Sequence, residues 1–169
     1  MRKSFSMIEM LGVIIVIMIL AGLLFPTISS IIDQGNKTKT KAKINGLKIA
    51  ITSFKSTYGY LPFSSDTTPI TEDTQLTAAQ YTRLLRNLTA TDTDMNPRAI
   101  RFLDKQDVSY KDAWDTTLKV ALDLDYDGEV NGSVMTPYTT TIGSEIAIWS
   151  AGSDTKNAST DDNVVSWKD

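Results

Sequence analysis

The sequence predicts an α+β protein in which one long N-terminal helix packs on a small head with an antiparallel sheet. Three observations predict this fold class. An apolar run of membrane-helix length begins the chain, a helical stripe of apolar residues continues it, and short alternating segments follow in the second half. Their boundaries divide the chain into three zones, which are 1–26, 27–59 and the head, 60–169.

The composition excludes several kinds of functional site. The 169 residues include no histidine and no cysteine, and the net charge is −3, from 17 basic and 20 acidic residues. Disulfides, thiolate zinc sites, histidine-based triads and imidazole bases are therefore impossible. The balanced charge argues against binding to nucleic acid. Carboxylates, hydroxyls, lysines and backbone groups remain as candidates.

The first expected element is a membrane-spanning helix over 5–26. Phe5–Phe25 carries one charge, Glu9, and its 21 residues would form a helix about 31 Å long, close to the ~30 Å core of a bilayer. A cleaved secretory signal peptide is the alternative, but no small-x-small cleavage site follows, and apolar residues continue past Pro26. A carboxylate in such a helix needs a partner, so Glu9 is a candidate functional residue.

The second expected element, 27–59, continues the same helix outside the membrane. Apolar residues recur at three- and four-residue steps and predict one buried stripe: Ile44, Leu47, Ala50, Ile51, Phe54 and Tyr58. Six lysines and no acid lie between Asp33 and Asp66, which indicates a solvated basic face, with a phosphate-binding patch as the alternative. Gly59 suits a left-handed cap, so the helix is expected to end there.

The predicted head, 60–169, contains a helix and at least two strands. Residues 77–80 form a capping-box pattern, and the helix behind it has an apolar face made of Tyr81, Leu84, Leu85 and Leu88. Leu118–Leu122 alternates between apolar and smaller or charged residues, and Glu145–Trp149 is a second strand candidate. From Asp112 onward, eleven acids stand against three lysines, so this half of the chain is acidic.

A carboxylate-rich loop near the C-terminus is the first candidate calcium site. Asp154, Asp161 and Asp162 close one irregular loop that has little apolar content. Carboxylates held this close repel one another unless a hard cation neutralises them. A mobile acidic tail is the alternative.

A second candidate calcium site follows the first predicted strand. Asp123, Asp125 and Asp127 match the first half of an EF-hand loop, in which alternating carboxylates converge around a turn. The second half of that pattern is missing, because Val134 stands where a bidentate glutamate is needed. A hairpin turn at Asp127-Gly128 explains the segment without metal.

The N-terminus, residues 2–11, resembles the signature of type IV prepilins and type II secretion pseudopilins. That signature has a short basic leader, a small residue and a Phe-Thr-Leu-Ile-Glu-Leu-like helix start, and Pro26 falls where the family helix carries its proline. The resemblance implies that prepilin peptidase cuts between Ser4 and Phe5 and so removes residues 1–4 as a leader. Ser4 replaces the preferred glycine, and Phe5 becomes the N-methylated terminus. It also implies that Glu9 pairs with the terminal amine of an adjacent subunit during assembly.

The C-terminal segment is similar to that of major pseudopilins. Residues 146–154 and 161–167 look like the calcium loop of that branch, and 112–115 resembles its Asp-Pro-Trp-Gly turn. Residues 64–106 match no known pattern. In that branch loop carboxylates and backbone carbonyls hold calcium, and the matching side chains here are Asp154, Asp161 and Asp162.

The resemblance implies a structural role without enzymatic activity. The chain would be a single-pass inner-membrane protein with a periplasmic head, a major pseudopilin that polymerises into a helical filament driving the export of folded proteins. Its partners would be prepilin peptidase, minor pseudopilins and the inner-membrane assembly platform. A type IV or competence pilin of a surface fibre is the alternative. A membrane-tethered enzyme is a third class, although the chain has no nucleophile or phosphate-loop motif.

Overall fold

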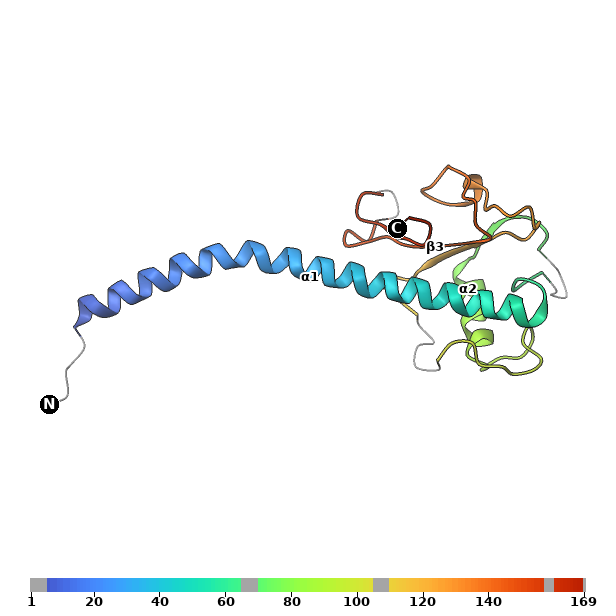
Figure 1. Ribbon diagram of the computed structural model, residues 1–169, viewed down its shortest axis with the longest axis horizontal. Helices are drawn as coiled ribbons and strands as arrows, with labels where there is room; N and C mark the ends of the chain where they lie inside the picture. Colours follow the sequence, from blue (N-terminus) through green and yellow to red (C-terminus); the bar gives the residue numbers. More distant parts are fainter. Residues whose placement is uncertain (1–5, 65–69, 105–109, 157–159, 169) are drawn as a thin grey trace. The chain divides into compact units, whose positions relative to one another are not determined.

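Helices and short strands alternate along the chain, which confirms the general α+β prediction. In the computed structural model they are, in order, α1 Met7–Tyr58, β1 Thr74–Gln75, α2 Ala78–Leu88, β2 Lys119–Leu122, the 3-10 helix η1 Gly132–Val134, β3 Ile146–Ser150 and β4 Val164–Val165 (Figure 1). The structure describes residues 6–64, 70–104, 110–156 and 160–168, apart from the side chains at 23–29. The chain divides into two units, Met1–Asn36 and Lys37–Asp169, and α1 contributes to both.

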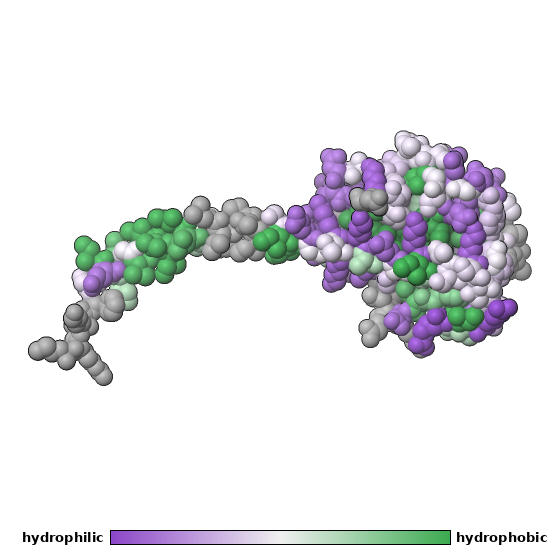
Figure 2. All heavy atoms as spheres, in the orientation of Figure 1, coloured by the Kyte–Doolittle hydropathy of each residue, from purple (hydrophilic) through white to green (hydrophobic). Residues whose placement is uncertain are grey.

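In the first unit, α1 exposes an apolar surface (Figure 2). The large apolar side chains between Met10 and Leu20 are each between 48% and 68% exposed. No helix in the described part of the chain is both long enough and apolar enough to cross a membrane. The expected membrane-spanning segment, 5–26, is therefore not found there. Phe5 and the side chains at 23–29 lie outside the described residues.

In the second unit, α1 buries the predicted apolar stripe. Its innermost side chains are at most 1% exposed: Ile44, Leu47, Ala50, Ile51 and Phe54. The helix ends at Tyr58, and Gly59 follows with φ +84° while its N–H donates to the Lys55 carbonyl at 2.7 Å. Glycine adopts this left-handed conformation without the steric penalty of a Cβ. The predicted stripe is confirmed from Ile44 to Phe54, its last residue, Tyr58, is only partly buried against the core, and the predicted end of the helix is confirmed.

The strands form one antiparallel sheet in the order β1-β2-β3-β4. The central pair, β2 and β3, matches the two predicted strands, with Val120 opposite Ile148. The predicted alternative of a hairpin at Asp127-Gly128 is wrong, because β2 pairs with a strand that begins only at Ile146. Residues 123–145 lie between the two strands and include an isolated bridge from Val130 to Ile142.

Side-chain alternation along the strands builds a core on each face of the sheet. Leu122 and Ile148 belong to the larger cluster, which contains the buried residues of α1 and α2. Their neighbours Ala121 and Trp149 point the other way, into a smaller cluster with residues of the 130–142 segment. Successive side chains of a strand face opposite sides, so both faces of a short sheet can be covered. The capping box at 77–80 is confirmed, and it starts α2 where its apolar face meets the larger core.

Candidate metal centre

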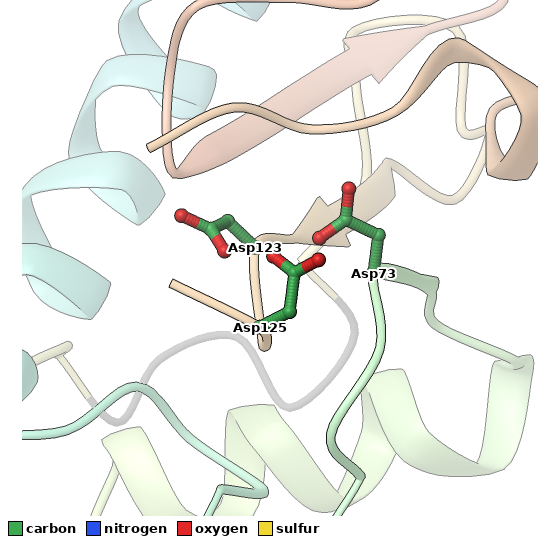
Figure 3. Close-up of side chains that lie close together, drawn as sticks. All are labelled: Asp73, Asp123 and Asp125. Atoms are coloured by element: carbon green, nitrogen blue, oxygen red, sulfur yellow. The ribbon is translucent and has the colours of Figure 1, made fainter. Parts of the chain in front are cut away.

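The register of the sheet brings together carboxylates from distant parts of the chain. Thr74 lies opposite Leu122 in the antiparallel pair of β1 and β2. Asp73 directly precedes β1 and Asp123 directly follows β2, so both lie at this end of the pair. One oxygen from each of Asp73, Asp123 and Asp125 lies within 4.8 Å of the other two (Figure 3). Carboxylates held this close repel one another, so this arrangement calls for a neutralising partner.

Asp123 organises the loop that follows β2. Its side chain is fully buried, and its two oxygens accept the N–H of Tyr126 at 2.6 Å and the N–H of Gly128 at 2.9 Å. Tyr126 and Gly128 have φ values of +64° and +91°, which close the turn around the carboxylate. Burial raises the pKa of Asp123, the two N–H groups oppose this, and Asp125 and Asp73 raise it further. The charged form is therefore disfavoured on balance.

Asp73 has one satisfied oxygen and one that lacks a partner. Its Oδ2 accepts the N–H of Asn131 at 2.6 Å, whereas Oδ1 is buried and has no hydrogen-bond partner among the described residues. Burial raises the pKa of Asp73, backbone donors led by the Asn131 N–H lower it, and the charges of Asp125 and Asp127 raise it further, so that the pKa is raised overall. A buried acceptor without a donor is costly. Calcium, which binds six to eight oxygens, suits this set of carboxylates.

The structure corrects the predicted membership of this site. Asp123 and Asp125 converge as predicted, but Asp127 is not part of the group of three, and its Oδ1 accepts the N–H of Glu129 at 2.9 Å. Asp73 takes its place, although the sequence reasoning did not find it. It lies in the segment that matches no known pattern, and no local signal marks the pairing of the two-residue β1 with β2.

The first predicted calcium loop is arranged differently. Asp162 Oδ2 accepts the Ser153 hydroxyl at 2.8 Å and the Asp154 N–H at 2.9 Å, while Asp154 Oδ1 accepts the Lys156 N–H at 2.7 Å. Burial raises the pKa of Asp162, but these hydrogen bonds outweigh burial and lower it overall. The described residues do not bring Asp154, Asp161 and Asp162 together as one group of converging carboxylates.

One oxygen of this loop still fits a cation. Asp162 Oδ1 is buried and has no hydrogen-bond partner in the described part of the loop. A Cβ at Gly152, which has φ +73°, would lie 2.6 Å from Asp162 Cγ, so the loop requires glycine there. Residues 157–159, which complete the loop, lie outside the described ranges. Calcium binding by this loop stays a prediction.

The turn at 112–115 is tied to the start of the C-terminal loop. Asp112 is 4% exposed, and its Oδ1 accepts two N–H groups of its own turn at 2.7 and 2.9 Å. Its Oδ2 accepts the Ser150 hydroxyl at 2.6 Å, and Ser150 Oγ in turn accepts the N–H of Gly152. Asp115 has φ +64° where the turn that this segment resembles carries glycine. Asp112 thus has a structural role in holding the loop.

Glu9 has a partner inside its own chain. The N–H of Ser6 donates to Glu9 Oε2 at 2.8 Å, and the N–H of Ile8 lies 3.4 Å from the Ser6 hydroxyl. Ser6 thus caps α1 through Ile8, and Glu9 supplies the side-chain half of a capping box; the Ser-Met-Ile-Glu pattern made this readable in the sequence, but the sequence analysis missed it. Ser4 and Phe5 lie outside the described residues, and Pro26 lies within α1 with an undescribed side chain.

The chain was compared with models of protein families, with curated proteins and with solved structures. None of these comparisons found a match. The pilin-like assignment therefore depends on the residues of the N-terminus and of the C-terminal segment, and it stays a prediction.

Proposed function

We propose that this chain is a structural, non-enzymatic subunit of a type II secretion pseudopilus. It would sit in the inner membrane by its N-terminal helix, with the head in the periplasm, and polymerise into a helical filament whose growth exports folded proteins. The observation that supports this best is the apolar surface of α1 between Met10 and Leu20, where every large apolar side chain is about half exposed or more. Contiguous apolar surface of this kind marks contact with lipid or with other helices.

The N-terminal residues would supply the assembly step. Removal of residues 1–4 by prepilin peptidase would create a new amine at Phe5. A carboxylate has acceptor sites for several hydrogen bonds, so the bond from Ser6 to Glu9 leaves room for the amine of an adjacent subunit. Pairing with that amine would neutralise Glu9 among apolar helices. Minor pseudopilins and the inner-membrane assembly platform would act with it at this step.

Calcium would order the head. We place it at Asp73, Asp123 and Asp125, because their oxygens converge within 4.8 Å and one buried oxygen of Asp73 lacks a donor. The loop of Asp154, Asp161 and Asp162 is the second position. Bound calcium would offset the burial and the repulsion that together raise the pKa values of Asp73 and Asp123.

The decisive experiment separates the charge of Glu9 from its capping role. The full chain, produced in membranes with a prepilin peptidase, is examined for filaments by electron microscopy. Glu9→Gln keeps an oxygen that can accept the Ser6 N–H but removes the charge, whereas Ser6→Ala removes the capping hydroxyl and keeps the charge. We expect filaments from the wild type and from Ser6→Ala, and a membrane-bound chain without filaments from Glu9→Gln.

Two outcomes would contradict the proposal. Filaments of Glu9→Gln at the wild-type level would remove the assembly role of this carboxylate, and a wild-type chain that never enters membranes or filaments would remove the function itself. Fibres found on the cell surface, with none confined to the periplasm, would indicate the alternative of a type IV or competence pilin.

A further inference from the structure

The second unit of the chain carries a basic groove and an acidic loop, and we propose that the groove of one copy binds the loop of another. The groove, called here the lysine groove, is formed by Lys37, Lys41, Asn163, Val164, Val165 and Lys168 together with Thr38. The acidic loop is the exposed segment 125–129. This inference rests on the proposed function, because it names a contact between the subunits of the filament.

The lysine groove presents positive charge from two distant segments of the chain. Lys37 and Lys41 come from α1, Lys168 follows β4, and the groove between them encloses about 290 Å³. No carboxylate is among its described lining residues. Asp162 directly precedes Asn163 of the groove in the sequence, but its Oδ2 accepts hydrogen bonds from Ser153 and Asp154 of its own loop. Lys37 and Thr38 make further contacts within the chain, so Lys41 and Lys168 supply the charge with which the groove suits an anionic partner.

The acidic loop presents the complementary charge. Asp125, Asp127 and Glu129 lie in a continuously exposed stretch. The hydrogen bonds described for Asp125 and Asp127 come from backbone N–H groups of the same loop, at 3.4 and 2.9 Å. Within the described ranges, no lysine or arginine forms an ion pair with any of these three carboxylates. Calcium at Asp125 would neutralise part of this charge, and Asp127 and Glu129 keep the loop acidic, so it suits a cationic groove.

The two surfaces lie at opposite ends of the helical part of this unit. Lys37 is 21 residues before Tyr58, which corresponds to about 31 Å of helix at ~1.5 Å per residue. The acidic loop is held near the far end, because the Tyr126 hydroxyl accepts the N–H of Leu61 at 2.9 Å and donates to Ser64 at 2.8 Å. Two separate complementary patches make a heterologous contact, and such contacts build open filaments when the rotation does not close a ring.

Exposed ion pairs are weak, so we expect the contact between the lysine groove and the acidic loop to orient the subunits. An exposed ion pair changes affinity by at most about fivefold, and physiological salt screens it. The lysine groove and the acidic loop therefore set the direction and register of neighbouring subunits, while the apolar surface of α1 supplies most of the affinity.

The absence of cysteine from the chain allows a direct test. Lys41→Cys and Asp127→Cys are placed together in the full-length chain, which is treated in membranes with a short thiol-specific cross-linker. We expect a ladder of dimers, trimers and longer products. The matched control pairs Asp127→Cys with Lys39→Cys, because Lys39 is exposed on the same helix but does not line the groove, and it should give little ladder.

Charge reversal supplies the second arm. Lys41→Glu should lower association about two- to fivefold, and Asp127→Lys in the same chain should restore it, whereas Lys39→Glu should change little. Filaments that contain no 41–127 product would overturn this inference and leave the proposed function intact. A 41–127 ladder without filaments would support the contact and count against the function. The absence of both cross-linked products and filaments would count against the contact and against the proposed function.

Discussion

Replacement of Asp73 by asparagine is expected to act in opposite directions with and without calcium. Without calcium, Asp73 adds a third negative charge beside Asp123 and Asp125, and its own pKa is raised by burial and by its acidic neighbours. Asp73→Asn removes that charge and should stabilise the head. With calcium, the same substitution removes a ligand and should destabilise it.

The distances set the scale of both effects. Two unit charges 4.8 Å apart repel by about 3.5 kcal/mol at an effective dielectric constant of about 20, and solvent around the exposed Asp125 reduces this figure. A cation present at 100 times its dissociation constant stabilises the fold by about 2.7 kcal/mol. For a protein of this size, that corresponds to a rise in melting temperature of roughly 5–10 °C.

The pH dependence of the calcium-free head has a defined sign. The pKa values of Asp73 and Asp123 are raised above the ordinary value of about 4 for aspartate. Their contribution to stability is therefore fully present below about pH 4 and is lost as the pH rises through the raised values. Calcium competes with these protons, so it should stabilise the head most at neutral pH, and Asp73→Asn should flatten the calcium-free profile.

The assay is thermal unfolding of the full chain in detergent, followed by tryptophan fluorescence, in excess chelator and in millimolar calcium. Trp149 is fully buried in the smaller core and reports on the head. Asp104→Asn, at an exposed position, is the matched control and should leave both transitions unchanged. If calcium raises the melting temperature of Asp73→Asn as much as that of the wild type, the reasoning is refuted. If the calcium effect is lost in Asp162→Asn and kept in Asp73→Asn, the site lies in the C-terminal loop.

Three further predictions concern the head. Phe54→Ala, at a fully buried position of α1, should lower the free energy of unfolding by about 3–5 kcal/mol in chemical denaturation, whereas the 66%-exposed Ile49→Ala should stay within about 0.5 kcal/mol. Thr77→Ala removes the cap of α2 and should lower the same quantity by about 1 kcal/mol; an unchanged midpoint would mean that the cap contributes nothing. Burial raises the pKa of Asp94, but hydrogen bonds from Asn87 and Arg83 lower it overall. The stability it contributes should therefore be lost as the pH falls below about 4, and Asp94→Asn should weaken this acid dependence in a pH series of melting temperatures.

Local patterns predicted the elements whose residues are neighbours in the sequence. The stripe from Ile44 to Phe54 was readable because a helix repeats every 3.6 residues, and the stop at Gly59 because glycine accepts a left-handed conformation. The capping box at 77–80 and the central strands β2 and β3 were readable for the same reason. The cap formed by Ser6 and Glu9 was equally local, because its residues lie within four positions of one another.

Long-range pairing decided the candidate metal centre. The alternating acids at Asp123, Asp125 and Asp127 predicted a convergent loop, and the Gly128 N–H closes that loop on Asp123 without forming the hairpin. Which third carboxylate completes the group depends on the register between β1 and β2, and a two-residue strand has too few side chains to encode that register locally. The sequence could thus indicate a cation loop, but only the folded sheet brings Asp73 close to Asp123 and Asp125, because contact between distant residues follows from strand pairing and core packing.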